Sequence, residues 1–165
     1  MKTFTIKANE HQEIELTKPG QYTIKLAGPG AELNLISTLQ TKGKIKTDLE
    51  ITIHHQAPHT RAKTTMKGVA RDQSHLRFKG KIIIDENCGD SQSFLTQRIL
   101  LLSPQAKAEA IPDLEIKTDD VSCSHAMSIA NISEDHLFYL MSRGLDRTKA
   151  EEIIIKGFLA YLSIN

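Results

Sequence analysis

The chain has 165 residues, of which 39% are hydrophobic, and a formal net charge of +1 at pH 7. This is the length of one domain that can bury a core of ordinary size. A charge so near zero gives no overall field that would attract nucleic acid or an anionic membrane, and no apolar run approaches the roughly 20 residues that span a bilayer. The N-terminus alternates like a strand and lacks a signal-peptide core, so we expect a cytoplasmic protein in which Cys88 and Cys123 are free thiols.

Residues 1–117 read as a succession of strands. Apolar residues alternate with polar ones, as at Tyr22, Ile24 and Leu26, and a period of two is typical of a half-buried strand. Turn signals such as Pro19-Gly20 separate the runs, which recur at intervals of about 8–12 residues. This spacing suits a sandwich, a barrel or a β-helix. The scarcity of Asn-Gly hairpin turns favours a β-helix and leaves a sandwich open.

Two helices are expected in the remainder of the chain, residues 118–165. Ser133 is a good N-cap and is followed by acidic residues in the first turn, where the helix dipole favours negative charge. Gly144 suits the position that ends this helix. A second helix should begin after a cap at Asp146 and continue to Tyr161. We therefore divide the chain into a β core, 1–117, and a C-terminal part, 118–165, that carries the helices.

The pair most able to perform chemistry is Cys123 and His125. Residues i and i+2 of an extended segment point to the same face, so the thiol and the imidazole can project together. Both groups are ligands for iron and zinc, but two ligands do not close a tetrahedral site. A second pair would have to come from elsewhere in the fold or from another subunit. The alternative is an inert, buried cysteine beside a surface histidine.

Other candidates are weaker. His54, His55 and His59 form a cluster that could bind metal, although alternating histidines are more often a solvated strand edge. Cys88 falls in a turn and is interpreted as structural. The chain has no phosphate-binding Gly-rich loop, no Gly-x-Ser-x-Gly and no Cys-x-x-Cys motif. We therefore expect no nucleotide to be bound by this chain.

Several short strings, taken in order, resemble the SufB/SufD family of iron–sulfur cluster assembly proteins. The combination is more specific than any one string, and the Cys-Ser-His string is similar to SufD. The strings are Lys67-Gly68-Val69, Leu100-Leu101-Leu102-Ser103, Ile111-Pro112-Asp113-Leu114-Glu115-Ile116, Asp119-Asp120-Val121-Ser122-Cys123-Ser124-His125 and Ser142-Arg143-Gly144-Leu145.

The resemblance implies a right-handed parallel β-helix followed by two C-terminal α-helices. It also implies a non-enzymatic scaffold that pairs through the β-helix with itself or with a SufB-like subunit. Cys123 and His125 would lie at that interface and bind iron or a transient iron–sulfur cluster. A SufC-type ABC ATPase would dock on the C-terminal helices, and a sulfur-donor protein is a further expected partner. The residues expected to bind the ATPase are Phe138, Tyr139, Arg143, Ile153, Ile154 and Phe158.

Two other functions remain open. The chain could be a purely structural interaction module in which Cys123 is inert. It could also be a cysteine-dependent enzyme with Cys123 as nucleophile and His125 as base. A spacing of two on one strand is a poor geometry for that couple, because the base must reach to within roughly 3 Å of the nucleophile.

Overall fold

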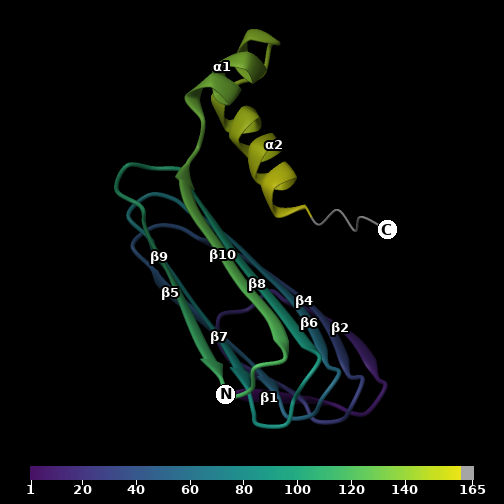
Figure 1. Ribbon diagram of the computed structural model, residues 1–165. Coiled ribbons are helices and arrows are strands. Elements are labelled where there is room, and N and C mark those ends of the chain that lie inside the picture. The colour runs from purple at the N-terminus through teal and green to yellow at the C-terminus, as the bar shows by residue number, and fades with distance from the viewer. Residues whose placement is uncertain (161–165) are drawn as a thin grey trace.

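The computed structural model describes residues 1–160 and shows two parallel sheets followed by two helices (Figure 1). Successive strands fall in opposite sheets, and every neighbouring pair in a sheet is parallel, so the chain winds as a solenoid. The odd sheet contains β1 (Lys2–Ile6), β3 (Gly20–Leu26), β5 (Lys46–His55), β7 (His75–Ile84) and β9 (Lys107–Ile116). The even sheet contains β2 (His11–Leu16), β4 (Glu32–Thr41), β6 (Arg61–Ala70), β8 (Ser91–Leu101) and β10 (Val121–Asn131). The expected parallel β-helix is confirmed, and the alternative, a β-sandwich, is not the fold.

The apolar residues of each alternating strand face the inside of the solenoid, and the polar residues face the outside. In β7, Phe78 and Ile82 point inward and are buried, while Lys79 and Lys81 between them point outward. The parallel register places similar residues of successive turns above one another: Ile24 pairs with Ile53, and Ile53 pairs with Ile82. One continuous apolar core results, because every strand contributes its inward residues to the same column.

Two glycines mark places where the opposing sheets leave no room for a side chain. A Cβ atom on Gly68 would lie 2.3 Å from the Cδ2 atom of Leu76, and one on Gly80 would lie 2.4 Å from the Cδ2 atom of Leu95. Glycine inside a strand is otherwise unfavourable, so a close approach explains both positions.

The turns stack in the same way as the strands. Gly30, His59 and Asp90 all have positive φ, at 71°, 60° and 53°, and occupy equivalent places before β4, β6 and β8. The N–H of His59 donates to the carbonyl of Gly89 at 3.0 Å, and that of Asp90 donates to the carbonyl of Asp120 at 2.7 Å. The backbone polar groups of each turn are thus satisfied by the next turn.

The two helices begin at the predicted caps. Helix α1 (Glu134–Ser142) starts after Ser133, whose hydroxyl accepts from the N–H of His136 at 3.3 Å. Helix α2 (Arg147–Leu159) starts after Asp146, whose carboxylate accepts from the N–H of Lys149 at 2.9 Å. Gly144 has φ of +92°, as expected after a helix end. The predicted continuation of the second helix to Tyr161 lies outside the described residues.

Helix α2 turns back onto the outer face of the even sheet and forms a second, smaller core there (Figure 1). The buried members of this core are Val69, Leu100, Ile132, Leu137, Ala150 and Ile155.

Strand β10 pairs with β8 from Val121 to Asn131, so the β-helix continues past the predicted boundary at residue 117. Among the described residues, no helix combines the length and hydropathy needed to span a membrane.

Candidate functional site

The site is built on β10, the outermost strand of the even sheet. Cys123 and His125 are in register with Ser93 and Leu95, two inward-facing residues of β8, so both point toward the interior of the solenoid. Nothing in the described chain lies beyond β10 or beyond β9, the outermost strand of the odd sheet. We call this region the open end. Its inward-facing apolar side chains are exposed: Leu114 (46%), Ile116 (40%), Met127 (58%) and Ile129 (43%).

Cys123 is half-buried at the open end and packs against the main core. Burial raises the pKa of its thiol, so the thiol is protonated at neutral pH. A protonated thiol is a poor nucleophile, whereas a metal can still displace the proton on binding. The environment of Cys123 therefore suits ligation better than unaided nucleophilic attack.

His125 is held by a buried amide. Its Nε2 atom lies 3.1 Å from the Oε1 atom of Gln97, and the Nε2 atom of Gln97 donates to the sulfur of Met66 at 3.6 Å. Since the amide nitrogen of Gln97 faces the sulfur, its amide oxygen faces the imidazole and accepts a hydrogen bond from the Nε2–H group. Burial also lowers the pKa of His125, which favours the neutral ring. The lone pair therefore resides on Nδ1, the atom available to a metal.

The three histidines of the other candidate cluster point in different directions. His54 faces outward and lies 2.8 Å from a carboxylate oxygen of Asp85, and His59 sits in a turn 3.0 Å from Asp90. His55 is fully buried, with Nδ1 2.7 Å from the hydroxyl of Thr60 and Nε2 without a partner. The part of the chain that the structure describes holds no group of three or more His, Cys, Asp or Glu side chains placed to bind one metal ion.

Cys88 lies in the turn between β7 and β8, and its side chain is buried. Its sulfur donates to the carbonyl of His55 at 3.6 Å. Burial raises the pKa of this thiol, so a structural role accounts for its surroundings.

The C-terminal helices divide the residues predicted to bind a partner into two sets. Phe138 and Tyr139 of α1 are 75% and 57% exposed, and Ile153 of α2 is 47% exposed. Arg143 is exposed too, with its guanidinium 5.3 Å from the centre of the Tyr139 ring. By contrast, Ile154 and Phe158 pack against the small core on the even sheet. Periodicity alone did not separate the two sets, because it does not say which side of α2 meets the sheet.

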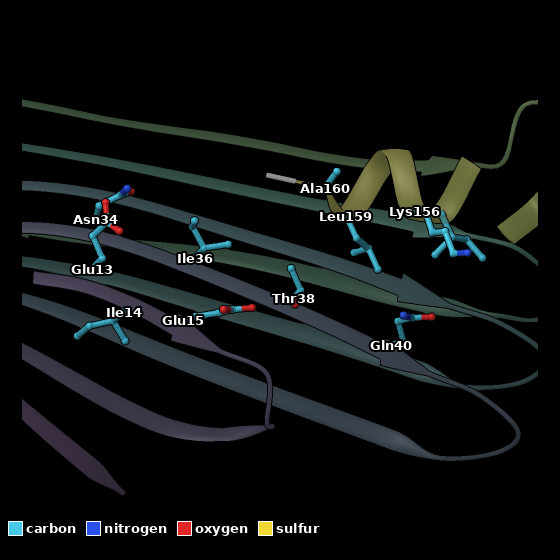
Figure 2. A pocket seen from close by; sticks show the side chains of 11 residues that line it. Glu13, Ile14, Glu15, Asn34, Ile36, Thr38, Gln40, Lys156, Leu159 and Ala160 are labelled. Carbon is cyan, nitrogen blue, oxygen red and sulfur yellow. The ribbon is translucent and has the colours of Figure 1, made fainter. Parts of the chain in front are cut away.

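A groove lies between the end of α2 and the outer face of the even sheet (Figure 2). Its volume is about 650 Å³, and its walls include Ile36, Thr38 and Gln40 of β4 with Lys156 and Leu159 of α2. No thiol or imidazole lines it, so it is separate from Cys123 and His125. Sequence reasoning missed the groove because it exists only where the helix returns to the sheet.

Comparison with known proteins agrees with this architecture. Residues 16–158 match the family model described as the SUF system FeS cluster assembly SufBD core domain. The match includes eight complete strands, β3 to β10, and nearly all of both helices, as well as Cys123 and His125.

Curated relatives carry the same family name. An iron–sulfur cluster assembly SufBD family protein of Staphylococcus saprophyticus is 29% identical over 135 residues, which cover 81% of this chain and 29% of the relative. One of Staphylococcus aureus is 28% identical over 164 residues, covering 96% of this chain and 35% of the relative. One of Mycobacterium tuberculosis is 31% identical over 105 residues, covering 64% of this chain and 12% of the relative. The chain thus spans about a third or less of the length of these relatives. With the family model matching most of its residues, the chain belongs to the SufBD core family of the SUF system for iron–sulfur cluster assembly.

Proposed function

We propose that this chain is a scaffold subunit on which iron or a nascent iron–sulfur cluster is held between two paired β-helices. The observation that carries the proposal is the position of Cys123 and His125 on a strand edge that also carries exposed apolar side chains. Family membership supplies the role in iron–sulfur assembly, and the open end supplies the place for it.

Pairing at the open end follows from two unmet requirements. The backbone edge of β10 has β8 on one side only, and such an edge is a template for another strand. Met127 and Ile129 extend the same inward face beyond His125 and are exposed to solvent. A second copy of this chain, or a SufB-like subunit, would cover both the edge and the apolar side chains.

The two protein ligands suit iron as the cargo of such an interface. A thiolate and an imidazole are soft to borderline donors. Gln97 binds the Nε2 side of the His125 ring, so the lone pair on Nδ1 stays free for a metal. Among residues 1–160, the open end provides one thiol and one imidazole, Cys123 and His125, so two copies would provide the four donors of a closed site.

The helices provide a separate surface for an ATPase. Phe138, Tyr139 and Ile153 are apolar or aromatic, exposed and carried by adjacent helices, with Arg143 beside them. We propose that a SufC-type ABC ATPase docks here, that it alone binds nucleotide, and that a donor protein delivers sulfur. Ile154 and Phe158 would then support the docking helix from below rather than touch the partner. These partners place the proposed function in the cytoplasm.

One observation favours a second candidate, a structural interaction module. Burial raises the pKa of Cys123, so the thiol could remain protonated and inert while the β-helix only assembles a complex. A cysteine-dependent enzyme has less support, because the Nε2 atom of His125 is hydrogen-bonded to Gln97 rather than to Cys123.

Anaerobic reconstitution tests the ligand assignment. Iron and sulfide added to the purified protein should give a visible chromophore and a shift to the paired species in sedimentation velocity. Cys123→Ala should lose the chromophore, whereas Ser124→Ala, on the outward face of the same strand, should keep it. Equal reconstitution by Cys123→Ala would remove the ligand role and leave the structural module.

Co-purification with a SufC-type ATPase tests the helical surface independently. Phe138→Asp and Ile153→Asp should each weaken capture, because both side chains are exposed and contribute little to the fold of the free chain. Lys18→Asp, an exposed residue before β3, serves as the control. Undiminished capture by both helix variants would count against this surface.

A further inference from the structure

The two sheets differ in how their outward-facing cations are neutralised. On the odd sheet, Lys79 lies 3.1 Å from Glu50, Lys81 lies 3.0 Å from Glu115, and Arg77 lies 3.4 Å from Glu109. Each cation of this ladder has a carboxylate across the strand. Such a face is balanced by its own residues and needs no external anion.

On the outer face of the even sheet, a group of cations on β6 and β8 has no such carboxylate across the strand within residues 1–160. Strand β6 presents Lys63 and Lys67 outward, and Arg98 of β8 is in direct register with Lys67. Within residues 1–160, no carboxylate oxygen lies within 4.0 Å of the charged nitrogens of Lys63, Lys67 or Arg98. Like charges at directly opposite positions are unfavourable, so this cluster is either a cost or a binding site.

The cations converge on a pocket closed on one side by α2. Its volume is about 430 Å³, and Gly157, Phe158 and Ala160 of α2 form the helical wall. The sheet contributes Lys63, Thr65, Lys67 and Arg98. Among residues 1–160, the lining therefore contains three cations, one hydroxyl donor and no acid.

Contacts with α2 hold two of these side chains in place without neutralising them. The Nζ atom of Lys67 donates to the carbonyl of Ala160 at 2.6 Å, and the guanidinium of Arg98 lies 5.5 Å from the centre of the Phe158 ring. Desolvation and the charge of Arg98 lower the pKa of Lys67. The carbonyls at the end of α2 would repel an anion, and the bond from Lys67 offsets the nearest of them.

Gly157 is a second, independent sign that the pocket is kept open. It lies in the last turns of α2, where glycine costs about 1 kcal/mol relative to alanine. A Cβ atom built on it would have no heavy atom within 4 Å, so packing within the described chain does not require glycine there. Because Gly157 lines the pocket, we expect a side chain at this position to extend into it.

We propose that this pocket binds a phosphate group, either as inorganic phosphate or as the phosphate of a small ester. Lys63, Lys67 and Arg98 supply charge and donors, and Thr65 adds a neutral hydroxyl donor. The pocket is larger than a bare phosphate ion, which leaves room for an ester group beside the Phe158 ring. The site uses none of the residues of the open end, so it stands apart from the proposed cluster-binding role.

Titration calorimetry at constant ionic strength tests the proposal, with inorganic phosphate and phenyl phosphate as the two probes. The protein should bind at least one probe saturably with a stoichiometry of one per chain. Lys63→Gln and Arg98→Gln should each weaken binding by about tenfold or more, because each removes a charged donor. Lys81→Gln removes the same charge from the paired ladder and should leave binding unchanged. Tighter binding of phenyl phosphate would identify the ester as the ligand, and equal binding would identify free phosphate.

Gly157→Leu provides a test that does not alter charge. Leucine is a better helix former than glycine and would meet no heavy atom at its Cβ, so the fold should persist and the thermal midpoint should not fall. Its side chain should nonetheless block the pocket and abolish phosphate binding. The proposal is overturned if neither probe binds saturably, if Gly157→Leu binds as well as the parent, or if Lys81→Gln weakens binding as much as Lys63→Gln.

Discussion

The inner turns of the β-helix and its last turn are built from the same pattern but differ in what lies beyond them. Ile99 of β8 is 1% exposed, while Ile129, its register partner on β10, is 43% exposed. Ile84 of β7 and Ile116 of β9 repeat the contrast in the other sheet, at 0% and 40%. Residue type and facing are identical within each pair. The degree of burial therefore depends on which turn of the β-helix the residue belongs to. The inward-facing apolar residues of the last turn remain exposed to solvent.

The largest expected effect separates the two isoleucines of the even sheet. Ile99→Ala should lower the free energy of unfolding by about 2–5 kcal/mol, because it leaves a cavity in a closed core. Ile129→Ala should cost less than about 1 kcal/mol in the unpaired chain, since the side chain is already half in water. Urea unfolding at low protein concentration measures both. Equal losses would mean that the last turn is as closed as the inner ones.

Acid sensitivity should also come from the inner turns. His55 is fully buried, and desolvation, together with the charge of His54, lowers its pKa from 6.5 to about 4. The unfolded chain therefore takes up a proton at this residue before the folded chain does. The contribution of His55 to stability is complete above pH 6.5 and is lost as the pH falls toward 4, by about 3 kcal/mol at most.

Unfolding free energies measured between pH 7 and pH 4 check this expectation. His55→Gln should flatten the pH dependence, because the replacement side chain does not titrate. His125→Gln gives the comparison from the last turn: burial lowers the pKa of His125 too, but its ring is only half-buried, so this variant should flatten the pH dependence less. A pH slope that survives in His55→Gln would assign the acid sensitivity to other groups.

The comparison also shows how far the sequence could lead. Period-two alternation predicted the strands, and Ser133 and Asp146 predicted where the helices start, because both signals are local. Local signals favoured a β-helix through the scarcity of hairpin turns but left a sandwich open, since both folds bury alternate residues of short strands. The resemblance decided between the two.

The sites depended still more on the fold. His54 and His55 are adjacent in the chain yet lie on opposite faces of β5, and His59 belongs to the following turn. Lys67 and Arg98 are 31 positions apart in the sequence and meet only through the parallel register. Cys123 and His125 were predicted as a pair because the two-residue spacing acts within a single strand.

Charge placed on the open end should break pairing without unfolding the chain. Met127→Lys and Ile129→Lys should each raise the dissociation constant of the paired species by more than about a hundredfold, because a two-fold interface buries the change twice. Ser128→Lys places the same charge on the outward face of β10 and should have little effect. Sedimentation equilibrium, alone and with a SufB-like subunit, makes the comparison. Pairing that tolerates both inward lysines would move the interface elsewhere.

The smallest expected effect concerns Gln97, which connects an inner turn to the last one. Its amide is fully buried between the sulfur of Met66 and the imidazole of His125, so it should fix the ring as the Nε2–H tautomer. Nitrogen-15 NMR of the iron-free protein should show that tautomer in the parent chain and a mixture in Gln97→Leu, with Gln92→Leu on the outward face of β8 as control. The affinity for ferrous iron should fall by about tenfold in Gln97→Leu alone, since an unoriented ring must be reordered on binding. If the spectrum shows His125 of the parent chain protonated at Nδ1, this assignment is wrong. The atom available to iron would then be Nε2 and not Nδ1.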